Sequence, residues 1–430
     1  MADATAQTGS ATDSRGRLLT SDGTPLRRAL ERANRRRKLT AFALVSPLLA
    51  FILIFFAFPI LQMMWRSVDN PQIVNALPRT LDELRDWDGR AVPPERVFVA
   101  LHADIMDDLE RPRREQRIGP LGVRLNYELS AARSAISRTA RDVPNFEAPF
   151  REAFTDAHRL WGQPELWRVI QREGRPLTLS YYIAALDREY DEFGNIVKRD
   201  ENRRIYVSLF GRTLALRLVI TGMTFLLGFP IAYYLSSLPM RYANLLMIAV
   251  LLPFWTSLLV RTSAWIVLLQ QQGVINNTLV GLGVIDDAGR FSLIYNQTGT
   301  IIAMTHILLP FMVLPLYSVM RTIPPSYVRA AKSLGATPWT AFRRVYFPQT
   351  LPGIGAGGVL VFIISIGYYI TPALVGGQSG RMISNEIARH IQQSLNWGLA
   401  AALGSMLLVG VLVLYWLYNR LVGADSLKLG

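Results

Sequence analysis

The stretch RAAKSLGATPWTAFRRVYFPQTLPGI, residues 329–354, decides the fold that the sequence predicts. It carries four basic side chains, no acidic side chain and three prolines. It lies between two apolar runs that reach the length of roughly 20 residues that a helix needs to cross a bilayer. A basic, proline-divided segment between two such runs predicts a folded loop at a membrane surface.

Six apolar runs of this length occur along the 430 residues. Backbone groups inside lipid must form hydrogen bonds within their own segment, so runs of this kind are expected to be helices. The sequence therefore predicts an all-α membrane protein. The six predicted spans are 40–65, 208–236, 243–269, 298–320, 353–375 and 399–422.

The basic residues predict how the spans are oriented. Nine Lys and Arg precede residue 39, and basic residues favour the cytoplasmic side of a membrane. The tail 1–39 is too long for the charged region of a cleaved signal, so we expect an uncleaved first span. Both termini and the loop 321–352 are then predicted to be cytoplasmic.

The segment 66–206, between the first two spans, is predicted to fold outside the membrane on the external side. It holds 23 basic and 24 acidic residues, a net charge of −1, so the rest of the chain carries +15 and the whole chain +14. That distribution argues against a nucleic-acid-binding surface. Helical spacing of apolar residues is carried by Val97, Leu101, Ile105, Leu109, Phe150 and Phe154. DEFGN, residues 191–195, predicts a hairpin turn.

Local signals in the opening stretch predict two short helices. One side of the first helix would hold Val328, Ala331, Leu334 and Gly335. Gly335 can end that helix, and Pro338 fits the first turn of the second helix with Thr337 as its cap. Pro348 and Pro352 would mark the return to the membrane. The residues alone leave open whether this surface lies on anionic lipid or binds a cytoplasmic partner.

The same stretch resembles the cytoplasmic loop of MetI-like permease subunits of binding-protein-dependent ABC importers. The family pattern is Glu-Ala-Ala, three residues, Gly, a spacer, and then an apolar residue and Pro. The matching residues are Ala330, Ala331, Gly335, Phe342, Val345, Phe347, Pro348, Pro352, Gly353 and Ile354. The family's Glu falls on Arg329, which reverses the charge there. The resemblance implies that loop 328–348 couples to an ATP-binding subunit through Arg329, Ala330, Ala331, Leu334, Gly335, Phe342 and Pro348.

The resemblance extends over spans one to six, without the insertion. Thr213-Leu214 and Gly228–Tyr233 match a segment of the family's second span, and three stretches are similar to spermidine/putrescine permease subunits, namely 252–265, 273–285 and 385–405. The implied fold is the type I ABC importer permease, with six transmembrane helices and a large external helical insertion between helices 1 and 2. The implied parts are a cytoplasmic basic tail 1–39, a first helix 40–65, a periplasmic insertion 66–206, a permease core 207–422 and a cytoplasmic tail 423–430.

The resemblance also implies the function and the partners. The chain would form the channel of an ATP-driven importer in the bacterial inner membrane. Its partners would be two ATP-binding subunits, a second homologous permease subunit, a periplasmic solute-binding protein and the lipid bilayer. The sequence holds no GxxxxGK[ST] loop, so we expect no enzyme activity and no cofactor, with ATP bound by a partner. Because cysteine is absent, disulfides and thiol chemistry are excluded, and we expect no catalytic or metal site.

A polyamine is the solute that the resemblance favours, with amino-acid derivatives or opines as the alternative. Carboxylates and aromatic faces bind polycations, and the candidates for the pathway are Trp255, Arg261, Trp265, Tyr368, Tyr369, Glu386 and Trp397. The aromatic residues would also fit interfacial belts, and Glu386 would also fit an ion pair with Arg381 or Arg389. Arg217 and Arg261 inside spans argue mildly against a cationic solute.

Two functions of another class are also compatible with parts of the sequence. The external insertion resembles what a membrane sensor with a periplasmic ligand domain would carry, but a sensor also needs a cytoplasmic output domain. A secondary transporter would need buried ionisable residues for coupling, and acidic residues are nearly absent from these spans.

Overall fold

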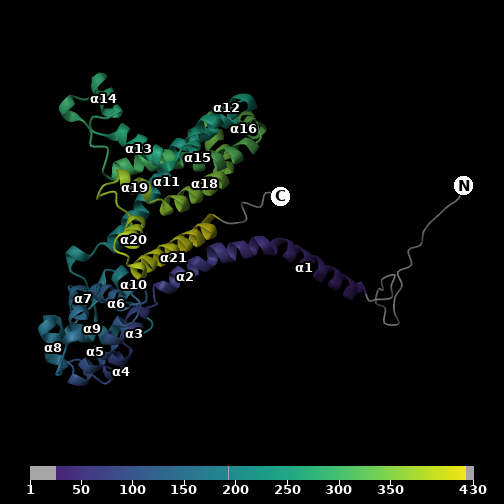
Figure 1. Cartoon of the computed structure of the whole chain (residues 1–430). Coiled ribbons are helices and arrows are strands. Elements are labelled where there is room, and N and C mark those ends of the chain that lie inside the picture. Colours follow the sequence, from purple (N-terminus) through teal and green to yellow (C-terminus); the bar gives the residue numbers. More distant parts are fainter. Residues whose placement is uncertain (1–25, 192, 423–430) are drawn as a thin grey trace, which may run out of the picture. The chain divides into compact units, whose positions relative to one another are not determined.

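The computed structural model describes residues 26–191 and 193–422. The chain divides into two units, residues 1–65 and 66–430, which are described separately. In the first unit α1 (Leu26–Ile52), a π-helical turn (Leu53–Ala57) and α2 (Phe58–Arg66) follow one another as one long helix (Figure 1). Its part Arg37–Arg66 is long and apolar enough to cross a membrane and contains the predicted span 40–65. Most of the predicted tail 1–39 and the tail 423–430 lie outside the described residues.

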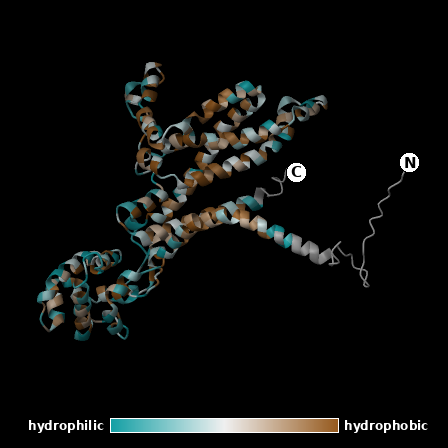
Figure 2. Ribbon diagram, turned by 45° about the vertical axis from the view of Figure 1, so that its right-hand side comes forward, coloured by the Kyte–Doolittle hydropathy of each residue, from teal (hydrophilic) through white to brown (hydrophobic). Residues whose placement is uncertain are grey.

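In the second unit three more helices match predicted spans closely. They are α11 (Tyr206–Ser237), α15 (Gln297–Thr322) and α21 (Trp397–Val422). Each contains a stretch apolar enough to cross a membrane, and Figure 2 shows hydrophobic residues along these helices and hydrophilic residues over the insertion. The predicted all-α membrane class is confirmed.

The third predicted span, 243–269, falls on two helical segments separated by a sharp bend. The chain forms α12 (Met240–Leu251), a 3₁₀ turn (Leu252–Trp255), α13 (Leu258–Leu269) and α14 (Val274–Gly281). The two halves, Met240–Trp255 and Leu258–Gly281, meet at 96°. Pro253 has no N–H to continue the helical hydrogen bonds, and the Ser257 side chain accepts a hydrogen bond from the Val260 amide and so starts a new helix.

The fifth predicted span, 353–375, differs at both ends. A continuous helix runs from Pro338 to Gly367 through α17 (Pro338–Ala341), a π-helical turn (Phe342–Tyr346) and α18 (Phe347–Gly367). The return to the membrane is therefore not bounded by prolines. The π-helical turn lies directly before Pro348, which has no N–H to donate to the preceding turn. The helix ends before Tyr368, and α19 (Ile370–Val375) follows as a separate helix.

The core of the spans is formed by α11, α15 and α18. Two glycines of α18 let it approach α15 closely, as small residues do between membrane helices. A Cβ atom added to Gly357 would lie 2.8 Å from the Met312 sulfur, and one added to Gly353 would lie 3.0 Å from the Val319 Cβ. Both distances are shorter than ordinary van der Waals contact, so larger residues would force the helices apart.

The insertion is a small helical domain with its own core. Its helices are α3 (Pro71–Ala76), α4 (Pro78–Glu83), α5 (Glu95–Leu109), α6 (Ile118–Asn126), α7 (Ala132–Asp142), α8 (Phe150–Ala157) and α9 (Pro164–Glu173), with 3₁₀ turns at Val143–Asn145 and Arg159–Gly162. Phe98, Phe154, Trp161 and Trp167 are almost fully buried in this core. The helices predicted from the spacing of Val97 and Phe150 are present as α5 and α8.

Carboxylates from distant parts of the chain cap the N-termini of several helices, where amide groups lack partners within the helix. Asp104 of α5 accepts hydrogen bonds from the Thr80 amide and hydroxyl at 2.9 and 2.8 Å. Asp108 caps α6, and Glu95 accepts from two amides at the start of α8. These long-range caps hold the helices of a domain that has no disulfide.

The first and last residues of the insertion lie side by side, at a neck formed by residues 68–70 and 176–178. The Asn70 amide donates to the Pro176 carbonyl at 2.9 Å, and the Thr178 amide donates to the Val68 carbonyl at 2.8 Å. After the neck come α10 (Ser180–Ala185), the strands β1 (Arg188–Tyr190) and β2 (Ile196–Lys198), and a 3₁₀ turn (Glu201–Arg203). The antiparallel pairing of β1 with β2 confirms the hairpin predicted at 191–195.

The segment after the neck is built into the permease core. Tyr181 of α10 packs so closely on α21 that a Cβ atom at Gly398 would meet its ring. The Asp187 carboxylate accepts hydrogen bonds from the amides of Tyr206 and Val207 at 3.0 and 2.8 Å, which caps α11. Together with α20 (Ile383–Gln392), α10 joins the insertion to the spans within the second unit.

Candidate functional site

The loop after α15 has the predicted helix, turn, helix form. α16 (Pro325–Ser333) ends at Leu334, and Gly335 follows with a φ of +87°, a conformation that glycine adopts without strain. The Thr337 side chain accepts a hydrogen bond from the Thr340 amide and caps α17, with Pro338 in its first turn. The predicted helix end at Gly335 and the predicted cap at Thr337 are both present.

The residues predicted to couple to a partner fall into two groups. Exposed on α16 and the turn are Arg329, Ala330, Leu334 and Gly335, with Ala331 half-buried beside them. Leu334 is 89% exposed and Trp339 is 68% exposed. No Cβ added to Gly335 would meet another atom within 4 Å, so the turn presents an open surface to which a partner can bind.

Phe342 belongs instead to the connection with the spans. Its ring lies 6.2 Å from that of Phe229 and 6.1 Å from that of Tyr233, both on α11, and 5.9 Å from that of Tyr346. α17 also continues into α18 without a break, so the exposed turn is connected to both α11 and α18. Pro348 lies near the start of α18 and lines the apolar cavity described below.

The exposed surface of the loop is positively charged. Arg329, Lys332, Arg343 and Arg344 are exposed, and the segment 321–352 contains no acidic residue. A partner that binds this surface would therefore need acidic or neutral groups opposite it.

A polar pocket of about 400 Å³ lies between α19 and α20. Tyr369 and Glu386, two predicted pathway residues, line it together with Asn385, Arg381 and Arg389. Amide side chains complete its wall, from Gln378, Gln392 and Gln393. Sequence analysis missed these three glutamines, although the spacing of residues 385, 389, 392 and 393 places polar side chains on one face of a helix.

Glu386 is 1% exposed and forms the ion pairs that the sequence predicted. Its carboxylate lies 2.6 Å from the Arg389 Nη2 and 3.4 Å from the Arg381 Nη1. One carboxylate thus faces two guanidinium groups, each of them close to half exposed. The pocket carries an excess of positive charge on its wall, and Glu386 is not a free anion.

His390 supports α20 beside this pocket. Its Nε2 lies 2.9 Å from the Tyr206 hydroxyl and its Nδ1 lies 2.8 Å from the Ser394 hydroxyl. Burial, with the nearby charge of Arg389, lowers the pKa of His390 to about 4. The ring is therefore neutral near pH 7.

The link between α18 and α19 is held by side chains from other helices. The Tyr368 carbonyl accepts a hydrogen bond from the Arg217 Nη2 at 2.8 Å and one from the Ser384 hydroxyl at 3.4 Å. The Tyr369 carbonyl accepts from the Asn385 Nδ2 at 2.8 Å. An unwound link in a span, with its carbonyls bonded to side chains, is a common setting for solute sites in transporters.

The other predicted pathway residues do not line the pocket. Trp265 donates from Nε1 to the His306 Nδ1 at 3.2 Å. Trp255 is 84% exposed at the break of the third span, as expected for an interfacial aromatic. Arg261 donates to the Thr256 carbonyl at 2.8 Å. The Trp397 ring lies 5.7 Å from the Arg66 guanidinium.

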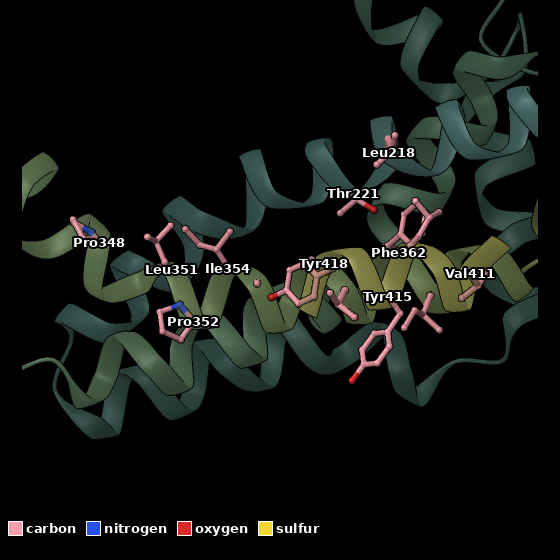
Figure 3. Close-up of a pocket in the computed structure, with 15 residues that line it drawn as sticks. Leu218, Thr221, Pro348, Leu351, Pro352, Ile354, Phe362, Val411, Tyr415 and Tyr418 are labelled. Atoms are coloured by element: carbon pink, nitrogen blue, oxygen red, sulfur yellow. The ribbon is translucent and has the colours of Figure 1, made fainter. Parts of the chain in front are cut away.

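A second cavity, of about 750 Å³, is apolar. Figure 3 shows it between α11, α18 and α21, with Leu218, Leu351, Phe362 and Tyr418 around it. Its lining holds no acidic or basic side chain. A charged solute would lose its hydration there without gaining a partner, so the polar pocket is the better candidate for solute contact. Within the described residues no three acidic or histidine side chains gather to hold a metal ion.

Comparison with known proteins agrees with this geometry. Residues 208–423 match the family model described as "Binding-protein-dependent transport system inner membrane component". The chain is 34% identical over 221 residues to the spermidine/putrescine transport system permease protein PotB of Escherichia coli (strain K12). The aligned region covers 51% of this chain and 80% of that protein. It is 33% identical over 227 residues to the inner membrane ABC transporter permease protein YdcU of the same strain, covering 50% and 71%.

Among solved structures, a bacterial ABC transporter involved in the import of the acidic polysaccharide alginate aligns with a TM-score of 0.43. The identity is 22%, over 52% of this chain and 80% of that chain. The family match begins after the insertion and covers α11 to α21, which includes both the loop 321–352 and the polar pocket. The chain therefore belongs to the family of binding-protein-dependent transport system inner membrane components, as a permease subunit of an ABC importer.

Proposed function

We propose that this permease imports a polyamine such as putrescine or spermidine. The observation that carries the proposal is the 34% identity over 221 residues to a spermidine/putrescine permease. Tyr369 supplies an aromatic face to the pocket, which suits a flexible polycation. The amide groups of Gln378, Gln392 and Gln393 supply acceptors for ammonium groups.

The importer works by alternating access, with energy supplied by other chains. Two ATP-binding subunits bind ATP in the cytoplasm, one of them against residues 328–348 of this chain. A second, homologous permease subunit completes the channel, and a periplasmic binding protein delivers the solute. Closure of the ATPase pair pushes the exposed turn at Leu334 and Gly335, and the aromatic contacts of Phe342 pass the movement to α11.

The orientation of the chain in the membrane follows from the proposed binding of the loop 328–348 to the ATP-binding subunit. The coupling loop and both termini are cytoplasmic, and the insertion and α20 are periplasmic. Because the chain has no cysteine, single cysteines can test this directly. A membrane-impermeant thiol reagent added outside spheroplasts is expected to label a cysteine introduced by Ser137→Cys in the insertion and not one introduced by Ser333→Cys in the loop. The reverse pattern would contradict the orientation.

A solute with a carboxylate, such as an amino-acid derivative or an opine, is the second candidate. It is favoured by the two guanidinium groups of Arg381 and Arg389 that face the single carboxylate of Glu386. A carboxylate would pair with the surplus guanidinium, whereas a polyamine would need acceptors from the glutamines or from the partner permease.

Thermal unfolding of the binding protein encoded beside this chain distinguishes the two candidates. A ligand that binds the folded protein raises its free energy of unfolding by RT ln(1 + [L]/Kd), and the melting temperature rises with it. We expect putrescine or spermidine to stabilise that protein, and amino acids and opines to leave it unchanged. Stabilisation by carboxylate-bearing ligands alone would contradict the polyamine proposal and support the second candidate.

A further inference from the structure

Arg217 is a charged residue in the middle of a span, and no acidic side chain of residues 26–191 or 193–422 pairs with it. It lies on α11, its side chain is fully buried, and its Nε and Nη1 have no hydrogen-bond partner within the described residues. A buried guanidinium in a membrane span is costly, and an apolar residue of the same length would pack there more cheaply. The one bond that it makes, to the Tyr368 carbonyl, therefore indicates its role.

That carbonyl ends α18. The last carbonyls of a helix lack partners within the helix and carry a partial negative charge. The Arg217 guanidinium supplies a donor and a positive charge to this helix end, where the chain unwinds for two residues before α19. The partner of the cation is thus the end of a broken span and not a carboxylate.

Thr213 and Arg217, one turn apart on α11, form hydrogen bonds with the segments on both sides of the polar pocket. Thr213 lies one turn before Arg217, is fully buried, and accepts a hydrogen bond from the Ile383 amide at 2.9 Å. Ile383 begins α20, which supplies Asn385 and Glu386 to the pocket. Tyr368 precedes Tyr369, which lines the opposite wall. One helix face therefore holds the start of α20 and the end of α18 together.

The break of the third span is built in a similar way. Arg261 donates to the Thr256 carbonyl, at the link between α12 and α13. Thr262, the next residue, shares a hydrogen bond of 3.1 Å with Thr371 of α19, and both are fully buried. Each broken span thus has an arginine on a carbonyl of its link, and α13 and α19 are bonded to each other.

From this geometry we infer that Arg217 is a positioning residue for transport: it fixes the link Tyr368–Tyr369 and α19, and so sets the affinity of the polar pocket for solute. The inference rests on the proposed function in so far as the pocket contacts the solute. The fixing of α19 stands independently of which solute is carried.

The first experiment measures whether Arg217 fixes α19. Val375 in α19 and Val361 in α18 are both fully buried, and the chain has no other thiol once Val375→Cys or Val361→Cys is introduced. In the assembled complex, Arg217→Met is expected to raise the labelling rate of the thiol at position 375 about tenfold, because the equilibrium for local opening of α19 shifts by the same factor. The labelling rate of the thiol at position 361 is expected to stay unchanged. Arg217→Lys, which keeps the charge, is expected to give an intermediate rate.

The second experiment measures the consequence for transport. With putrescine-loaded binding protein, Arg217→Met is expected to raise the half-saturating concentration for ATP hydrolysis about tenfold, with the maximal rate within about twofold of the unmodified complex. Arg217→Lys is expected to restore part of the affinity. Arg241→Met, an exposed arginine on α12, is the matched control.

Three results would overturn the inference. Both thiols could become reactive together, which would indicate general loosening. A second such result is that the labelling rate of neither thiol changes in Arg217→Met or in Arg217→Lys. The maximal rate and the affinity could fall together without rescue by Arg217→Lys, which would indicate a purely structural role. If even the unmodified complex does not respond to putrescine, the proposed solute fails, and the labelling experiment still decides the role of Arg217.

Discussion

At the scale of single residues, the insertion depends on a buried ion pair. Arg124 and Glu173 are each 1% exposed, with 2.6 Å between Nη2 and Oε2. Burial alone would raise the pKa of Glu173, but attraction to Arg124 and hydrogen bonds from Ser180 and Arg172 outweigh it, so the pKa lies below its usual value. A lowered carboxyl pKa stabilises the fold above the ordinary pKa, and this contribution is lost as the pH falls through the folded value.

Removing one partner of this pair leaves an uncompensated buried charge. We expect Arg124→Met to destabilise the insertion by about 3–5 kcal/mol, measured by urea unfolding of the purified protein in detergent. Arg79→Met is the control, because Arg79 pairs with Asp107 at 2.7 Å but both are 53% exposed, and such pairs contribute about 1 kcal/mol or less. Equal losses in the two variants would show that burial of the Arg124 pair is not what matters.

His390 predicts a pH dependence of the permease core. Its pKa is lowered from 6.5 to about 4 in the folded protein. Between these values the unfolded chain binds a proton that the folded chain does not, so stability falls as the pH falls through this window. We expect His390→Gln, which keeps a hydrogen-bond partner for Tyr206, to flatten the fall of melting temperature from pH 6.5 to 4. Parallel curves for variant and unmodified protein would refute this.

At the scale of elements, the proposed coupling to the ATPase can be tested at the exposed turn between α16 and α17. We expect Gly335→Trp to reduce solute-stimulated ATP hydrolysis by about tenfold or more, because a bulky side chain at a docking surface blocks close approach. The positive φ of Gly335 would strain most residues, so Gly335→Asn is the control, since Asn tolerates this conformation. Loss of activity in both variants would indicate backbone strain and not docking.

Comparison of the predicted spans with the observed helices shows which elements could be predicted from the sequence. Spans that stay one continuous helix, such as α11 and α15, were predicted within a few residues, because length and hydropathy suffice there even with a proline inside the helix. The sharpness of the bend after Pro253 does not follow from the proline alone, since a proline within a span bends some helices and divides others. The Ser257 cap decides between these outcomes. The start of the fifth helix was missed because the π-helical turn before Pro348 has no sequence signal.

The polar pocket was predicted only in part for a related reason. Tyr369 and Glu386 were expected in the pathway from residue type alone, and the ion pairs of Glu386 followed from the neighbouring arginines. The contact of Arg217 with the Tyr368 carbonyl joins residues 151 positions apart, and spacing within one sequence does not reveal such a pair. The long-range caps by Asp104 and Asp187 were missed for the same reason.

At the scale of the whole molecule, the neck makes the insertion separable from the core. We expect replacement of 71–175 by a short Gly-Ser linker to keep the spans folded, since residues 68–70 and 176–178 already lie side by side. We expect the variant to lose delivery of solute by the binding protein, measured as stimulated ATP hydrolysis. Full stimulation after this replacement would show that the insertion does not contact the binding protein.

A longer deletion provides the contrast. Removing 70–200 also removes Tyr181, which packs on α21, and Asp187, which caps α11. We expect this variant to have a lower melting temperature than the 71–175 replacement. If the two melt alike, α10 and the hairpin contribute nothing to the permease core.

The central claim is tested most directly by uptake of radiolabelled putrescine into proteoliposomes. These would contain this chain, its partner permease and the ATPase, with ATP enclosed and the binding protein outside. The account predicts uptake of putrescine or spermidine that requires both enclosed ATP and the binding protein, and that is lost in Gly335→Trp. Uptake that proceeds without ATP hydrolysis, or that serves a carboxylate-bearing solute and neither polyamine, would contradict it.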